Sequence, residues 1–280
     1  MRRFGCAGWL AMAPAWAPAW APAWVLAWAL AWAAALGVPA MAAEMSRAVV
    51  AAALARAHGH AAKLAGRDLS GLDLSGLDFS GADLAGANLH GAKLVGCRFG
   101  HADLRGANLM MAWVMRANFD HADLAGANLY GLVVYPALDV VMADRPSFVG
   151  ADLSGTRIIA NLGNVDLRGA KFVGARLGVD NTNQSMGKMK ILLPDANLAG
   201  ADFTGADLNG GDFRFADLRG AKLRGANLEE ADFSGADLRG ADLTGADVKD
   251  ALFTDAKLAG AHGLDAVHGR ASAQGLPPLR

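Results

Sequence analysis

A five-residue period runs through most of this chain and restricts its fold more than any other feature. Stepping by five from Leu69 to Val134, and again from Leu198 to Leu258, every position holds Leu, Phe or Val. A spacing of five fits neither the helical repeat of about 3.6 residues nor the alternation of a strand. Each five-residue unit must therefore form one short side and then turn. We call the large apolar residue the centre of its unit.

The other positions of the unit are also regular. Stretches such as "GADLAGANLHGAKL" carry Ala two residues before the centre, Asp or Asn one before, and very often Gly two after. Asx and Gly residues support tight turns. This A-(D/N)-L-x-x pattern, over about residues 64–261, resembles the pentapeptide-repeat family. The resemblance implies an all-β solenoid, a right-handed quadrilateral β-helix with four pentapeptides per coil, in which the centre and the residue two before it point inward.

The phenylalanines provide an independent test of four units per coil, because that geometry stacks residues twenty apart. Two sets of three obey the spacing: Phe79, Phe99 and Phe119, and then Phe213, Phe233 and Phe253. Stacked rings are worth about 0.5 to 1.5 kcal/mol per pair beyond their burial. The sequence therefore predicts aromatic ladders inside a solenoid of about eight coils.

The period breaks twice. The centres Val134 and Phe148 are fourteen positions apart, and Leu177 and Leu198 are twenty-one positions apart, where five is the rule. We number the four faces from that of Leu69. The breaks then predict extruded loops at 135–147 and 178–192. The phenylalanine ladder is expected to resume at Phe148, and Leu193 is expected to be the centre of the missing unit. Loops of this length on a rigid scaffold usually carry function.

The N-terminal segment has the order of a bacterial export signal. Two arginines precede a long Ala/Trp/Leu stretch, which ends in Ala40-Met41-Ala42. Residues 1–42 are therefore predicted to be a signal peptide, leaving a periplasmic or secreted protein without stable membrane insertion. Two alternatives stay open: an uncleaved membrane anchor, which its prolines disfavour, and a cytoplasmic product whose translation begins at Met41 or Met45.

Two further segments flank the repeats. Residues 43–63 are predicted to form a helical cap, with Ser46 as N-cap, because the first coil of a solenoid has no partner on its outer side. Residues 262–280 lack the pattern and are expected to be a C-terminal tail.

Charge and cysteine content exclude several classes of protein. The chain has 26 basic and 27 acidic residues, a net charge of -1, so no nucleic-acid partner is expected. Only Cys6 and Cys97 are present, and Cys6 lies in the predicted signal, which excludes a disulfide framework. Cys97 is expected to be a small buried residue.

No catalytic residues, cofactor or metal site are predicted. The chain has no serine nucleophile motif, phosphate-binding glycine loop or Cys/His zinc spacing, so it is not expected to be an enzyme. His101 and His121 stack but lack a clear third ligand. Asp83, Asp103, Asp123 and Asp152 share face four; such a row could bind cations or imitate phosphates, but hydrogen bonds to their own turns are the favoured interpretation.

One region departs from the simple composition of the repeats, "GANLMMAWVMRANF" at 106–119. The outward positions of this stretch, the next coil and the two loops are expected to bring several aromatic and Met side chains together. Because such side chains are enriched at protein interfaces, we predict that these residues bind a partner. An alternative is that the loops fold over this surface and close a small apolar cluster. The residues are Met110, Met111, Trp113, Met115, Tyr130, Val133, Tyr135, Met142, Met186 and Met189.

Two main functional hypotheses follow. The first is a noncatalytic exported scaffold that binds an unidentified protein or cell-envelope component through this surface and the loops. The second comes from the resemblance: some pentapeptide-repeat proteins confer quinolone resistance by binding DNA gyrase as mimics of duplex DNA, and some of those have two loops. The export signal and the near-balanced charge weigh against a gyrase or topoisomerase binder, which would require a cytoplasmic product. A weak metal or polysaccharide binder is a third possibility.

Overall fold

The computed structural model describes residues 45–57, 60–134, 145–179 and 189–278. The predicted signal peptide, residues 135–144 of the first predicted loop and residues 180–188 of the second lie outside these ranges. Within them, no helix combines the length and apolar character needed to cross a membrane.

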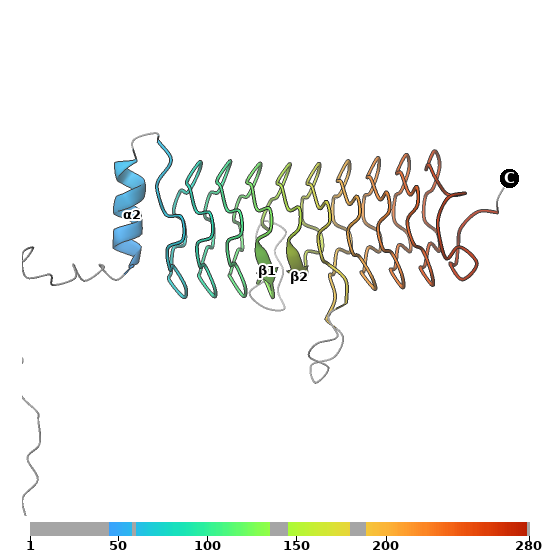
Figure 1. Cartoon of the computed structure of the whole chain (residues 1–280), viewed down its shortest axis with the longest axis horizontal. Coiled ribbons are helices and arrows are strands. Elements are labelled where there is room, and N and C mark those ends of the chain that lie inside the picture. Colours follow the sequence, from blue (N-terminus) through green and yellow to red (C-terminus); the bar gives the residue numbers. More distant parts are fainter. Residues whose placement is uncertain (1–44, 58–59, 135–144, 180–188, 279–280) are drawn as a thin grey trace, which may run out of the picture. The chain divides into compact units, whose positions relative to one another are not determined.

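The chain from Lys63 onward winds into stacked coils whose sides pair in parallel (Figure 1). In the uninterrupted stretches each bridge joins residues twenty apart, as in Lys63 with Asp83 and Asp83 with Asp103. Four such ladders run along the stack, one per face, which confirms four pentapeptides per coil. The sides are so short that three-residue strands form only once in the described chain, where β1 (Asn128–Tyr130) pairs with β2 (Arg157–Ile159).

The ladders continue beyond the expected end of the repeats. The ladder that begins at Lys63 passes through ten residues and ends at His262, so this face has ten levels, against the expected eight or so coils. His268 and Gln274 also pair, with Asp247 and Leu252, inside the segment expected to be a tail. Pairing uses backbone groups, so it can continue where the apolar centres have stopped.

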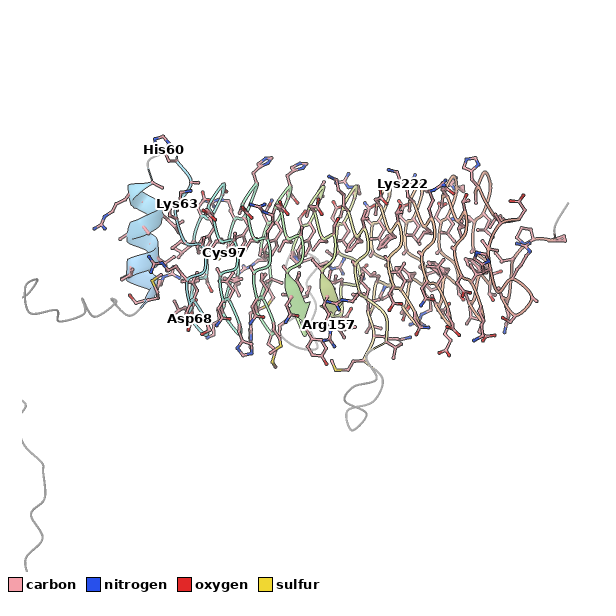
Figure 2. All side chains as sticks on the ribbon, viewed as in Figure 1. His60, Lys63, Asp68, Cys97, Arg157 and Lys222 are labelled. Atoms are coloured by element: carbon pink, nitrogen blue, oxygen red, sulfur yellow. The ribbon has the colours of Figure 1, made fainter. Side chains whose placement is uncertain are left out.

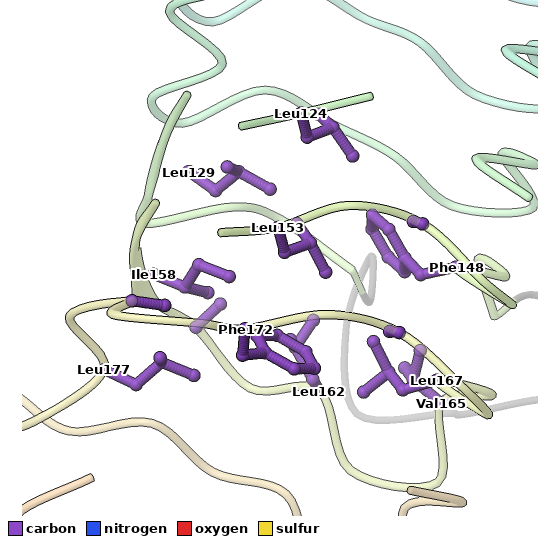
Figure 3. Close-up of a cluster of buried hydrophobic side chains, with 14 of the residues drawn as sticks. Leu124, Leu129, Phe148, Leu153, Ile158, Leu162, Val165, Leu167, Phe172 and Leu177 are labelled. Carbon is purple, nitrogen blue, oxygen red and sulfur yellow. The ribbon is translucent and has the colours of Figure 1, made fainter. Parts of the chain in front are cut away.

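The interior of the coils contains the centres and the alanines two residues before them, as predicted. Phe79, Phe99 and Phe119 form one stack, with ring centroids 4.9 and 4.7 Å apart. Phe148 continues it at 4.8 Å, which confirms that the ladder resumes after the first break. Figure 3 shows Phe148 and Phe172 among the leucines of this core.

Most corners are tight turns. In the unit after Leu104, the N–H of Ala107 donates to the carbonyl of Leu104 at 3.0 Å. Gly106 between them has a φ of 64°, the left-handed value that a type II turn requires. This requirement explains the recurring glycine two residues after the centre.

Helix α2 (Arg47–Arg56) covers the first coil. The Ser46 hydroxyl accepts a hydrogen bond from the N–H of Val49 at 3.4 Å, as an N-cap does. Val50 is fully buried in the core cluster, and the Arg47 guanidinium donates to the carbonyls of Asp73 and Ser75 at 3.0 and 2.8 Å. The helix therefore supplies both apolar and polar partners to an edge that would otherwise lack them.

The repeat resumes in register after both breaks. Ser147 pairs with Asn118 on face three, and Leu192 pairs with Asn161 and Asp212 on face two. Leu193 is fully buried, as expected of the missing centre. The first break therefore lies at the corner between faces two and three, and the second at the corner between faces one and two.

Candidate protein-binding surface

Met111 and Trp113 form the exposed part of the predicted surface. Their side chains are 53 % and 39 % exposed, and they lie around the corner between faces one and two. Trp113 pairs with Val133 in the face-two ladder, and the N–H of Met111 donates to the carbonyl of Tyr130 at 3.0 Å. We call Met110, Met111, Trp113, Tyr130 and Val133 the aromatic patch. Met110, Tyr130 and Val133 are half-buried.

Tyr130 is held by residues from two other coils. Its hydroxyl donates a hydrogen bond to Sδ of Met189 at 3.2 Å, so Met189 does reach the patch as the sequence predicts. The guanidinium carbon of Arg157 lies 5.0 Å from the ring centroid, within cation–π range. Arg157, which lies on β2 and is labelled in Figure 2, was not among the predicted residues. Its position in the face-one ladder, paired with Asn128 one coil away, could have indicated that it lies near Tyr130.

The remaining predicted residues differ in accessibility. Met115 is only 8 % exposed although it does not belong to the interior cluster, so its outward position does not make it an open contact residue. Tyr135, Met142 and Met186 lie outside the described residues. The patch thus has two parts, a Tyr130 end covered by Met189 and Arg157 and an open end at Met111 and Trp113.

Phe215 is an exposed aromatic residue that the sequence reasoning missed. It is 66 % exposed and has a φ of 59°. Its ring lies over Gly235, where an added Cβ would come within 2.5 Å of it. The available signal was a bulky apolar residue two positions after a centre, where Gly is usual; Met111 has the same position and a φ of 57°.

The carboxylates on face four are bound to their own turns. Each of Asp83, Asp103, Asp123 and Asp152 accepts the N–H two residues later, at 3.4, 3.1, 3.1 and 3.0 Å. Basic side chains also neutralise the row: Lys63, Arg105 and Lys171 lie 3.4, 2.6 and 3.8 Å from Asp83, Asp103 and Asp152. The favoured interpretation of this row is confirmed.

The other candidates for chemistry form no site in the described structure. His101 and His121 stack at 5.2 Å, but no group of three His, Cys, Asp or Glu side chains able to hold a metal occurs among the described residues. Burial raises the pKa of the Cys97 thiol to about 11, so this side chain stays protonated and unreactive at neutral pH.

The lowered pKa values of two carboxylates in the turns lead us to expect that the protein loses stability in acid. The Ser80 hydroxyl, followed by Arg98, lowers the pKa of Asp78 from 3.8 to about 2, and the Thr244 hydroxyl, against some desolvation, does the same for Asp242. A carboxylate whose pKa is lower in the native than in the unfolded state stabilises the fold at pH values above its unfolded-state pKa. This stabilisation is lost as the pH falls through the native-state pKa. Thermal midpoints measured by circular dichroism should be level above pH 5 and fall between about pH 4 and 2. A midpoint that rises on acidification in this window would contradict this mechanism.

Buried apolar centres, one bridge per unit and left-handed turn residues at the corners, most of them glycines, define a β-helix built from pentapeptides. The family model "Pentapeptide repeats" matches in eight copies, including residues 62–100, 73–110, 82–119, 196–235 and 231–262. This chain belongs to the pentapeptide-repeat family. No curated protein matches the sequence.

Solved structures of pentapeptide-repeat proteins are among its relatives. HetL of the cyanobacterium Nostoc sp. strain PCC 7120, involved in heterocyst differentiation regulation, is 29% identical over 74% of this chain and 87% of its own, with a TM-score of 0.24. A protein of the Arabidopsis thaliana thylakoid lumen is 29% identical over 44% and 70%, with a TM-score of 0.18. The plasmid-mediated fluoroquinolone resistance protein QnrB1 is 20% identical over 70% and 84%, with a TM-score of 0.25.

Proposed function

We propose that this protein is a noncatalytic scaffold, exported from the cell interior, that binds another protein or a cell-envelope component through the aromatic patch. The observation that carries the proposal is that two large apolar residues, Met111 and Trp113, are exposed two positions apart in the sequence and lie beside Tyr130. Contiguous exposed apolar patches often mark interaction sites, and Trp and Tyr are enriched among the residues that dominate binding energy.

The rigidity of the coils supports this role. Neighbouring coils are joined by backbone hydrogen bonds on every face, such as those from Trp113 N–H to the carbonyl of Ala92 and from Val133 N–H to that of Ala112, at 2.9 and 2.8 Å. Side chains on such a frame lose little backbone entropy when a partner binds. The neutralised carboxylate row on face four favours this proposal over mimicry of duplex DNA, the alternative that the resemblance raises.

Capture from separated cell fractions tests the proposal. Immobilised protein should recover a partner from the cell-envelope fraction, and Trp113→Ala should reduce recovery about tenfold or more, as expected when a central interface residue is truncated. Val173→Ala is the matched control: Val173 is 41 % exposed but lies on face four, so its loss should leave recovery unchanged. The N-terminus of the purified protein, by mass spectrometry, should lie near Ala43.

Three outcomes would contradict the proposal. Equal recovery with wild type, Trp113→Ala and Val173→Ala would remove the patch as a binding site. A product that begins at Met41 or Met45 in the cytoplasm would contradict export. Recovery of gyrase or a topoisomerase from the cytoplasmic fraction would favour the alternative function.

A further inference from the structure

Met111 is the most exposed methionine among the residues that the structure describes. It is 53 % exposed, whereas Met110 is half-buried and Met115 is only 8 % exposed. The sulfur of Met189 accepts a hydrogen bond from the Tyr130 hydroxyl at 3.2 Å, which engages one of its lone pairs. Oxidation of a thioether requires a lone pair that the oxidant can reach, so the sulfur of Met111 is the one best placed for it.

The repeat explains this exposure. Met111 stands at a corner, two residues after a centre, where Gly is usual, and it has the left-handed φ of 57°. The same corner is occupied by Gly91 in the coil before and by Gly131 in the coil after, each twenty residues away. Cγ of Met111 lies 3.5 Å from the point where a Cβ of Gly131 would be. Neither glycine has a side chain that could cover the thioether.

Hydrogen peroxide oxidises such a thioether without another reactant. The sulfur lone pair attacks one oxygen of the peroxide, the O–O bond breaks and an S–O bond forms. The departing hydroxide takes up the proton of the transferred oxygen and leaves as water. The sulfur loses two electrons and the peroxide gains them. The product, methionine sulfoxide, is polar and chiral, and methionine sulfoxide reductases convert it back to the thioether.

A sulfoxide at this corner would change the aromatic patch. Ala112, between Met111 and Trp113, is fully buried, so the two exposed side chains stand on either side of one inward residue. A partner surface that fits an apolar thioether offers no hydrogen-bond donor to a sulfoxide oxygen. Burying that oxygen without a hydrogen bond costs free energy, so the oxidised patch should bind the partner more weakly.

We propose that Met111 is a redox modification site, at which a peroxide forms a sulfoxide that prevents the partner from binding to the aromatic patch. This rests on the proposed function, since it assigns a means of regulation to the same surface. A bound partner covers Met111, so the reaction takes place on the free protein. Oxidation and binding therefore exclude one another, and reduction of the sulfoxide restores the binding surface.

Peptide mapping by mass spectrometry after treatment with hydrogen peroxide tests the site. Trypsin cuts after Arg105 and Arg116 and so leaves Met111 and Met115 in one peptide, residues 106–116. In the folded protein Met111 should be oxidised about tenfold faster than Met115, because the reaction follows exposure of the sulfur. In protein unfolded by urea the two rates should be equal. Equal rates in the folded protein would overturn the assignment.

Capture of the partner tests the consequence. For each variant, recovery from the cell-envelope fraction after peroxide treatment is divided by recovery before it. This ratio should be about one tenth for the wild type and should return to about one after treatment with methionine sulfoxide reductase and a dithiol. Met111→Leu has no sulfur at the corner, so its ratio should be about one whatever its untreated recovery. Met189→Leu removes another sulfur of this face and should keep the ratio of the wild type.

Other results would overturn the inference. An equal loss of recovery in Met111→Leu would assign the effect of peroxide to a different residue. If Trp113→Ala reduces capture while oxidation of Met111 does not, this inference fails and the proposed function stands. If Met111 is oxidised selectively but the untreated wild type recovers no partner, the proposed function fails and the sulfoxide has no binding to control.

Discussion

Replacing Phe99 by Ala should lower the free energy of unfolding by about 3 to 5 kcal/mol, the usual cost of truncating a buried phenylalanine. Phe99 is fully buried between Phe79 and Phe119, with ring centroids 4.9 and 4.7 Å away. Its loss removes two ring contacts and leaves a cavity, since backbone hydrogen bonds fix the coils on either side. Urea unfolding followed by circular dichroism measures the change.

Phe215→Ala is the matched control, because the same side chain is deleted from a position that is 66 % exposed. It should change stability by no more than about 0.5 kcal/mol, as surface substitutions usually do. The cooperativity of solenoid unfolding depends on interactions between neighbouring units. The dependence of the unfolding free energy on urea concentration must therefore also be compared between the variants. Similar losses for Phe99→Ala and Phe215→Ala would be incompatible with a stacked interior.

Gly211→Ala should destabilise the protein by about 1 to 3 kcal/mol through overpacking, although Ala is the usual residue two positions before a centre. A Cβ at Gly211 would lie 2.7 Å from Cε2 of Phe213, 3.0 Å from the carbonyl oxygen of Leu208 and 3.1 Å from Cγ2 of Ile191. Phe213 has little room to move, since it stacks on Phe233 at 4.8 Å. Thermal unfolding of the variant measures the effect.

The reason lies one coil away. Ile191 stands twenty residues before Gly211 in the same inward position, where most units have Ala, and both are buried. The large side chain and the missing one compensate in volume. Adding Ile191→Ala to Gly211→Ala should therefore recover part of the loss, giving a coupling of about 0.5 to 3 kcal/mol typical of residues in contact. A stabilising Gly211→Ala, or strictly additive effects, would show that the two residues are independent.

The periodicity predicts much of this fold because it is local chemistry repeated. Centres at every fifth residue must be buried, and Asx and Gly residues must turn, so the square coil follows from the units themselves. The phenylalanines at twenty-residue spacing then fix the number of units per coil. The five-residue spacing of centres returns at Phe148 and at Leu193, and this predicts how the coil resumes after each break.

The candidate surface was predictable only in part. The sequence indicates which side chains of the Trp113 region point outward, because direction follows from position in the unit. It does not indicate which of them are covered: Met115 is 8 % exposed and Trp113 39 %, although both are outward positions on face two. Cover depends on groups from distant parts of the chain, as when Met189 reaches Tyr130 across 59 residues.

Residue spacing therefore determines the coil, its interior and the faces on which side chains lie, since each depends on backbone geometry that every unit repeats. Accessibility, the pairing of Arg157 with the ring of Tyr130, and the fit of Gly211 against Ile191 were decided by the folded molecule. These depend on how side chains from different coils share space, and a repeat pattern contains no information about that contact until the coils are stacked.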